Sequence, residues 1–309
     1  MNPFPVLTAD FLISRLAPPV AKPVRAVLDT DTYNEVDDQF ALSLAMLSKD
    51  SLTLEAVYAA PFHNSRSTGP EDGMEKSHDE ILKILHLLGM ERDGFVFKGS
   101  RQWMAAPDQP VDSPAARNLV AKAMAGDGKE PLYVLTIGAP TNVASALLME
   151  PELVRRIVVI WLGGQPLEWH TAREFNLQQD LFASQLLFNS GVPLVQIPCT
   201  NVAEHLRVTL PELDAFLGGK SRLGDYLCSI VHGYTNDPFG WSKVIWDIST
   251  VAWLIHSDWI FTTLEHSPIL TANYTYSRDV RRHLYRVGVH LDRDAIFRDL
   301  YKKLNDFGK

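Results

Sequence analysis

The chain of 309 residues contains only two cysteines, Cys199 and Cys228, and they do not have the spacing of metal ligands. Neither a disulfide framework nor a cysteine-based zinc site is supported. No apolar run approaches the roughly 20 residues that a membrane-spanning helix needs, so we expect no membrane contact. The N-terminal segment has no basic region, and Asp10 and Arg15 interrupt its apolar stretch. It does not resemble a signal peptide, which predicts a cytoplasmic protein.

A basic cluster is also missing, because the net charge is −8 and the lysines and arginines are scattered. Nucleic-acid binding requires a basic face, so we expect no nucleic-acid partner. Neither G-x-G-x-x-G nor a P-loop follows any expected strand, which leaves a dinucleotide site unsupported. No Gly/Ser linker or low-complexity run divides the chain, and 46% of its residues are hydrophobic. These features predict one globular domain over residues 1–309.

Apolar, β-rich runs alternate with helical patterns along the chain. The expected strands cover 24–28, 52–60, 131–138, 155–164 and 192–198, and the expected helices cover 40–47, 75–88, 142–149 and 180–191. This alternation predicts an α/β fold with an open, mostly parallel central sheet that is flanked by helices, as in Rossmann-like proteins.

Five carboxylates lie between the first expected strand and the first expected helix: Asp29, Asp31, Glu35, Asp37 and Asp38. The carboxyl ends of strands in an open α/β sheet are where ligands bind. Such closely spaced negative charges repel one another unless a cation neutralises them, and Ca²⁺ and Mg²⁺ prefer carboxylate oxygens. Alternatively, the last two aspartates only favour the positive end of a helix dipole. The density of carboxylates favours a metal site.

Polar groups interrupt apolar patterns in three other segments. Asp247 lies within the expected apolar helix 242–255, where a carboxylate needs a metal or another partner, such as a salt bridge or the helix start. If 173–180 is extended, Glu174 and Asn176 point the same way and suit sugar hydroxyls, although a solvated loop edge is the alternative. The turn LTIGAPTN (135–142) offers free backbone carbonyls to a hard cation.

Five motifs, in order, resemble those of the inosine-uridine nucleoside hydrolase family, and the likeness runs from about residue 24 to about residue 300. They are the aspartates of DTDTYNEVDD, the turn TIGAPTN, the strand end WLGGQP, the segment EFN followed by Asp180, and IWDISTVAWL. The resemblance implies a calcium-dependent hydrolase that cleaves the N-glycosidic bond of a ribonucleoside and releases nucleobase and ribose.

The same resemblance assigns expected roles. It implies that Ca²⁺ is held by Asp31, Asp38, Asp247 and the backbone carbonyl of Ile137, with Asp31 also acting as general base on a metal-bound water. Asp37 would accept a hydrogen bond from the ribose 2′-hydroxyl. It further implies that Asn176 holds a ribose hydroxyl, that Glu174 binds the 5′-hydroxyl and that Asn64 supports the base and sugar site. A homodimer or homotetramer is expected by analogy.

Three departures from the family pattern bear on the substrate. Thr32 to Val36 separate Asp31 from Asp37 by two residues more than usual, which allows Glu35 to join or shield the site. An asparagine that usually precedes E-F-N is missing. Trp246 lies where many members carry a histidine that is proposed as the acid for the leaving base. Purine-preferring members have tryptophan there, which predicts stacking on the base, with Trp169 or Trp241 as a second wall.

Two other functions compete with this interpretation. The longer turn and the missing asparagine are also compatible with a non-catalytic protein that binds ribose or a nucleoside. VLDTDTY could instead be the D-x-D of a haloacid-dehalogenase-type phosphatase, with Asp29 as nucleophile and Mg²⁺ as metal. The phosphatase hypothesis explains neither the Asp37–Asp38 pair nor IWDIS, and Tyr33 stands where that family has Thr or Val.

Overall fold

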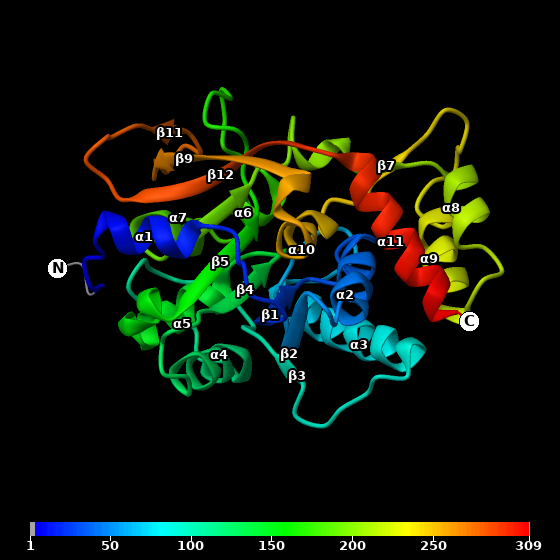
Figure 1. Cartoon of the computed structure of the whole chain (residues 1–309), viewed down its shortest axis with the longest axis horizontal. Helices are drawn as coiled ribbons and strands as arrows, with labels where there is room; N and C mark the ends of the chain where they lie inside the picture. Colours follow the sequence, from blue (N-terminus) through cyan, green and yellow to red (C-terminus); the bar gives the residue numbers. More distant parts are fainter. Residues whose placement is uncertain (1–3, 309) are drawn as a thin grey trace.

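The computed structural model describes residues 4–308, which fold around an eight-stranded sheet (Figure 1). Its strand order is β3-β2-β1-β4-β5-β6-β12-β9, and all neighbours are parallel except β12 and β9. The predicted mostly parallel sheet is therefore confirmed. The strands of this sheet are β1 (Val24–Thr30), β2 (Leu52–Ala59), β3 (Val96–Lys98), β4 (Leu132–Thr136), β5 (Ile157–Leu162), β6 (Leu194–Ile197), β9 (Ile260–His266) and β12 (Leu284–Leu291).

Helices and two short antiparallel ladders surround this sheet. β7 (Arg207–Val208) pairs with β8 (Lys243–Val244), and β10 (Ile269–Leu270) pairs with β11 (Tyr276–Ser277). Within the described residues, no helix is both long and apolar enough to cross a membrane. The helices are α1 (Ala9–Leu16), α2 (Asp38–Leu47), α3 (Pro70–Leu88), α4 (Pro114–Met124), α5 (Thr141–Met149), α6 (Phe175–Gln179), α7 (Leu181–Asn189), α8 (Leu210–Phe216), α9 (Arg222–His232), α10 (Ile248–Ile255) and α11 (Arg293–Phe307), with 3₁₀ turns η1 (Pro151–Arg155), η2 (Ala203–His205) and η3 (Ser257–Trp259).

The central strands are buried on both faces, which explains their nearly continuous apolar sequences. In β1, Leu28 packs in the core with Phe40 of α2, whereas Val27 packs in a second core with Leu119 of α4 and Leu147 of α5. Side chains of a strand alternate between its two faces, so each strand feeds both cores. Helices α2, α3, α10 and α11 cover one face, and α4, α5 and α7 cover the other.

Two predicted helices begin five or more residues from the expected position. α3 begins at Pro70, five residues early, because proline suits the first helical turn and Glu71 and Asp72 favour its positive end. α10 begins only at Ile248, because the preceding residues form β8 and the Ile245 N–H donates to the Leu206 carbonyl at 2.8 Å. Asp247 therefore lies at the helix start and not within a helix.

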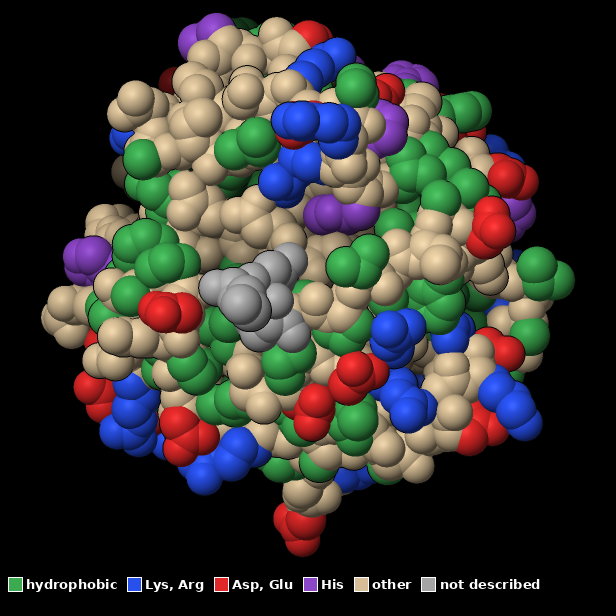
Figure 2. Space-filling model, turned by 90° about the vertical axis from the view of Figure 1, so that its left-hand side faces the viewer, with side chains coloured by type: hydrophobic (Ala, Val, Ile, Leu, Met, Phe, Trp, Pro, Cys, Tyr) green, Lys and Arg blue, Asp and Glu red, His purple; other side chains and the backbone are tan. Residues whose placement is uncertain are grey.

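The two ends of the molecule are built differently. Figure 1 shows α1 beside the β9–β12 edge at one end and α8, α9 and α11 at the other. On the face at the α1 end, acidic and basic side chains are intermixed (Figure 2). The strand order reverses direction between β1 and β4, and the carboxyl ends of strands at such a switch point form the usual ligand crevice of an open α/β sheet.

Candidate active site

The acidic turn joins the end of β1 to the start of α2 through a buried hydrogen-bond network. The Thr30 hydroxyl donates to Asp38 Oδ1 at 2.5 Å. The Asn34 N–H donates to the Asp31 carbonyl at 2.7 Å, which closes the first bend of the turn. Asp29 accepts a hydrogen bond from Asn142 Nδ2 at 2.8 Å, so the turn is also tied to α5.

Four aspartates gather beneath the carboxyl edge of the sheet. Carboxylate oxygens of Asp37, Asp38 and Asp247 lie within 4.8 Å of one another, and all three residues are buried. Both carboxylate oxygens of Asp31 are buried and have no hydrogen-bond partner. Buried carboxylates without a partner are costly, and a bound cation removes that cost.

Burial and mutual repulsion disfavour the charged forms of these aspartates. Burial and then the charges of Asp38 and Asp37 raise the pKa of Asp31 well above its ordinary value. Burial, followed by the charges of Asp37 and Asp38, does the same to the pKa of Asp247. Burial and the charge of Asp37 raise the pKa of Asp38 to about 7. The oxygen donors and their repulsion fit a hard divalent cation.

The turn after β4 lies against the acidic cluster. A Cβ atom at Gly138 would lie 3.0 Å from Asp31 Cγ and 3.1 Å from Ala60 Cβ, so this backbone approaches Asp31 as closely as glycine allows. The adjacent Ile137 carbonyl accepts a hydrogen bond from Asn176 Nδ2 at 3.1 Å. The structure therefore brings Ile137, Asp31 and Asn176, all of which the sequence predicted as site residues, into one region.

The condition that residues 173–180 are extended is not met, because α6 occupies most of this segment. Glu174 caps α6, and its carboxylate accepts the N–H groups of Asn176 at 3.0 Å, Leu177 at 3.1 Å and Gly164 at 2.9 Å. Capping satisfies the free N–H groups of the first helical turn, and here it outweighs the alternating pattern that suggested a strand. Both Glu174 and Asn176 nevertheless face the same cavity.

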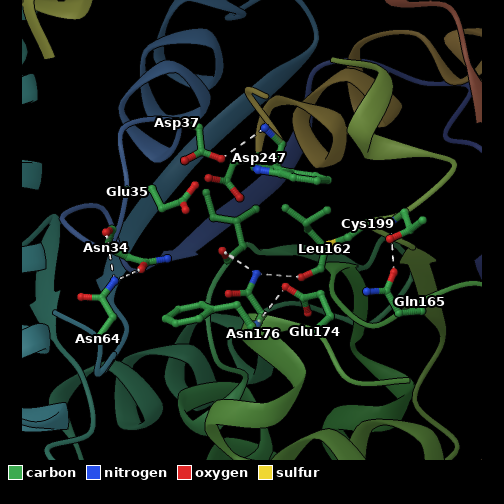
Figure 3. A pocket seen from close by; sticks show the side chains of 14 residues that line it. Asn34, Glu35, Asp37, Asn64, Leu162, Gln165, Glu174, Asn176, Cys199 and Asp247 are labelled. Atoms are coloured by element: carbon green, nitrogen blue, oxygen red, sulfur yellow. Dashed lines mark hydrogen bonds between the residues drawn. The ribbon is translucent and has the colours of Figure 1, made fainter. Parts of the chain in front are cut away.

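A cavity of about 480 Å³ opens above the aspartates (Figure 3). Figure 3 shows Asp37 and Asp247 on one wall, Asn176 and Glu174 on the facing wall, and Asn34, Glu35 and Asn64 at one end, opposite Gln165 and Cys199. Asp31 and Asp38 do not line it. The lining residues are Asn34, Glu35, Asp37, Asn64, Ile137, Leu162, Gln165, Glu174, Phe175, Asn176, Cys199, Thr200, Trp246 and Asp247.

Glu35, from the longer acidic turn, joins the cavity lining through an ion pair. Its Oε2 lies 2.5 Å from Lys243 Nζ, and its Oε1 accepts a hydrogen bond from the Tyr234 hydroxyl at 2.9 Å. Lys243 is only 6% exposed and also lies 3.9 Å from Asp37 Oδ1. Burial lowers the pKa of Lys243, but the charges of Asp37 and Glu35 outweigh burial and raise it. Nothing in the sequence around Lys243 signals this role.

Trp246 lines the cavity next to Asp247, and its backbone N–H donates a hydrogen bond to Asp37 Oδ2 at 3.2 Å. The expectation that Trp169 or Trp241 forms a second aromatic wall is wrong, because neither is among the described side chains that line this cavity. Trp169 is 37% exposed, whereas Trp241 packs with Tyr234 at a ring separation of 6.4 Å.

Asn64 and several residues that sequence reasoning missed complete the cavity lining. Asn64 Nδ2 donates to Asn34 Oδ1 at 2.6 Å, so these two amides form a rigid pair. At the other end, Gln165 Oε1 accepts the Thr200 N–H at 3.0 Å. Gln165 lies in the motif WLGGQP but was given no role, whereas Cys199 and Thr200 follow the end of β6, where no pattern in the sequence distinguishes them.

A mostly parallel α/β sheet with a buried carboxylate cluster and a cavity at its switch point defines the class: an open α/β protein with a ligand site whose carboxylates could hold a cation. The chain belongs to the inosine-uridine preferring nucleoside hydrolase family, whose model matches residues 26–298. It is therefore an N-ribosyl hydrolase that acts on the N-glycosidic bond of ribonucleosides. The family is metal-dependent, and the buried carboxylates could hold the ion.

Individual relatives are distant in sequence but cover most of the chain. The pyrimidine-specific ribonucleoside hydrolase RihA of Salmonella paratyphi A is 29% identical over 267 residues, which cover 77% of this chain and 81% of that protein. The structure of a purine-preferring ribonucleoside hydrolase from Gardnerella vaginalis has a TM-score of 0.74 at 21% identity and covers 92% of this chain and 99% of that one. The inosine-uridine preferring nucleoside hydrolase from Bacillus anthracis has a TM-score of 0.70 at 16% identity, with 92% and 100% covered.

Proposed function

We propose that this hydrolase is calcium-dependent and that Asp31 is its general base. The observation that carries the proposal is the pair of buried, partnerless carboxylate oxygens of Asp31 next to a cavity that carboxylates and amides line. Asp31, Asp38, Asp247 and the Ile137 carbonyl would hold the ion. When bound, Ca²⁺ neutralises these carboxylates and lowers the pKa of water that it coordinates.

Different residues of the chain activate the water and bind the sugar. Asp31 accepts the proton of the attacking water, since no hydrogen bond engages its oxygens. Asp37 accepts a hydrogen bond from the 2′-hydroxyl, and Asn176 and Glu174 bind the other ribose hydroxyls. These carboxylates also stabilise the positive charge that develops on the sugar in an oxocarbenium-like transition state.

A reducing-sugar assay over purine, pyrimidine and nitrophenyl ribosides tests this function. We expect the wild type to release ribose, to lose activity on chelation and to regain it with Ca²⁺. Asp31→Asn should lower kcat by about 10²- to 10⁴-fold, the usual contribution of a general base. The matched control is Asp50→Asn, because Asp50 is an exposed aspartate between α2 and β2.

Three results would contradict the proposal in different ways. Near-normal kcat in Asp31→Asn would remove Asp31 as the base. Full activity after chelation would show that the enzyme does not need a metal. Tight binding of ribose or a nucleoside, with no free sugar released from the nucleoside over hours, would instead support a non-catalytic binding protein. The longer turn is the feature that motivates this alternative. Family membership leaves the phosphatase hypothesis without support.

A further inference from the structure

The end of the cavity that holds Asn34, Glu35 and Asn64 is where a leaving base would lie. In a furanose, C1′ and C4′ flank the ring oxygen, so the base and C5′ extend from opposite ends of the sugar. With the 5′-hydroxyl at Glu174, on the side of Gln165 and Cys199, C1′ points towards the opposite end. Figure 3 shows Glu35 at that opposite end, with its carboxylate directed into the cavity.

This end of the cavity presents negative charge to its contents. Lys243 and the Tyr234 hydroxyl contact the two oxygens of Glu35, but neither residue is among the described side chains that line the cavity. One buried ammonium faces two carboxylates, those of Glu35 and Asp37, and both carboxylates line the cavity. The cation is therefore behind the wall, and an uncompensated negative charge faces inwards.

The cavity also lacks a cationic or phenolic proton donor. Among the described residues that line it, there is no histidine, lysine, arginine or tyrosine. The Tyr234 hydroxyl donates a hydrogen bond to Glu35 and so is already engaged. A neutral base would leave as an anion unless it is protonated, and the carboxylate at this end of the cavity, Glu35, is paired with Lys243.

We propose that the Glu35 end of the cavity selects N-ribosides whose leaving base is a cation, such as a pyridinium or a 7-alkylpurinium. When the C1′–N bond breaks, its electron pair goes to the base nitrogen and cancels the positive charge, so the base departs neutral without a proton. Water forms the new bond to C1′ and gives one proton to Asp31. Glu35 is thus a specificity-determining residue.

An aromatic ring in the lining of the same cavity supports the same ligand class. Trp246 lines the cavity, and an indole face attracts a flat cation more strongly than the faces of the other aromatic side chains do. A carboxylate and an indole together therefore favour a charged heteroaromatic ring over a neutral one of the same shape. This inference rests on the proposed hydrolysis of ribosides by the same site.

The test compares Glu35→Gln with the wild type on 7-methylguanosine and guanosine at pH 6, with nitrophenyl riboside as a common reference. Intrinsic leaving ability cancels when each variant is compared with the wild type on the same substrate. We expect kcat/KM for the cationic riboside to fall at least 10-fold more than for guanosine. Glu55→Gln is the matched control, since Glu55 is a carboxylate paired with Arg25 away from the cavity.

Equal losses on the two ribosides would overturn the proposal. Inactivity of the wild type on every riboside, including nitrophenyl riboside, would instead remove the proposed function. Calorimetric titration of the wild type with 1-methylnicotinamide and with neutral nicotinamide tests selection by charge independently of turnover. It also provides this test if Glu35→Gln does not fold. The cation should bind at least 10-fold more tightly, and equal binding would count against selection by charge.

Discussion

Asp29 and Asp31 are two residues apart in one strand end, yet they lie in different environments. Asp29 accepts a hydrogen bond from Asn142, whereas both oxygens of Asp31 have no partner. The sequence predicted that carboxylates gather here, because their number in one turn is visible. It could not predict that Lys243 would pair with Glu35, because that contact joins residues 208 positions apart and no local pattern marks it.

Trp246 gives a prediction at this scale. Trp246→Ala should lower kcat/KM for purine nucleosides about 3- to 10-fold more than for nitrophenyl riboside, because aromatic stacking contributes about 0.5–1.5 kcal/mol and the nitrophenolate needs little activation. Steady-state kinetics on both substrates measure the difference. Trp169→Ala, outside the cavity, is the control. Equal losses would mean that Trp246 is only part of the packing.

At the scale of elements, the alternation of strands and helices was predictable over residues 24–198 except for β3 and α4, which no expected element covered. The later part was harder, because β9 and β12 form an antiparallel pair at the sheet edge and β7 and β8 are only two residues each. The short helix α6 was missed for the same reason. A five-residue helix has too few residues to show a period, although the hydrogen bonds of its cap, from the Asn176 and Leu177 N–H groups to Glu174, are local.

The turn between β4 and α5 carries the prediction for this scale. Gly138→Ala should weaken Ca²⁺ binding at least 10-fold, because the added methyl group would press against Asp31 Cγ at 3.0 Å. Calorimetric titration of Ca²⁺ into the metal-free protein measures this without reference to activity. Gly69→Ala is the control, since no atom lies within 4 Å of the added carbon. Unchanged affinity would show that Asp31 does not need this close approach.

For the molecule as a whole, the order of its eight strands brings the ends of β1, β4 and β5 together. The parallel sheet was predictable, but its strand order was not, because periodicity does not record which strands are neighbours. The expectations of one domain, a homodimer or homotetramer and a cytoplasmic location stay predictions. A single cooperative unfolding transition and a mass measurement in solution would test the first two.

The buried carboxylates predict how the stability of the whole molecule depends on pH. Burial raises the pKa of Asp29 to about 7, and burial with the charge of Asp37 does the same for Asp38, whereas unfolded aspartates titrate near pH 4. The folded, metal-free protein therefore binds more protons between about pH 4 and pH 7, so its stability falls as pH rises through this window.

Urea unfolding at pH 5 and pH 8, with chelator or with Ca²⁺, measures this dependence. Without metal, the free energy of unfolding should fall by at least about 1.4 kcal/mol, the value of one pKa unit. With Ca²⁺ the fall should be smaller, because a cation favours the charged carboxylates. A metal-free protein that becomes more stable over this range would contradict the expectation.

The amide of Asn176 has one further consequence. Both of its N–H bonds are used on main-chain carbonyls, those of Ile137 and Leu162, at the ends of two neighbouring strands. Only its oxygen remains for a ligand, and that oxygen can accept a hydrogen bond but not donate one. The amide thus distinguishes sugars by their hydrogen-bond donors. A free hydroxyl can donate a hydrogen bond to the Asn176 oxygen, whereas a methyl ether has no hydrogen to donate.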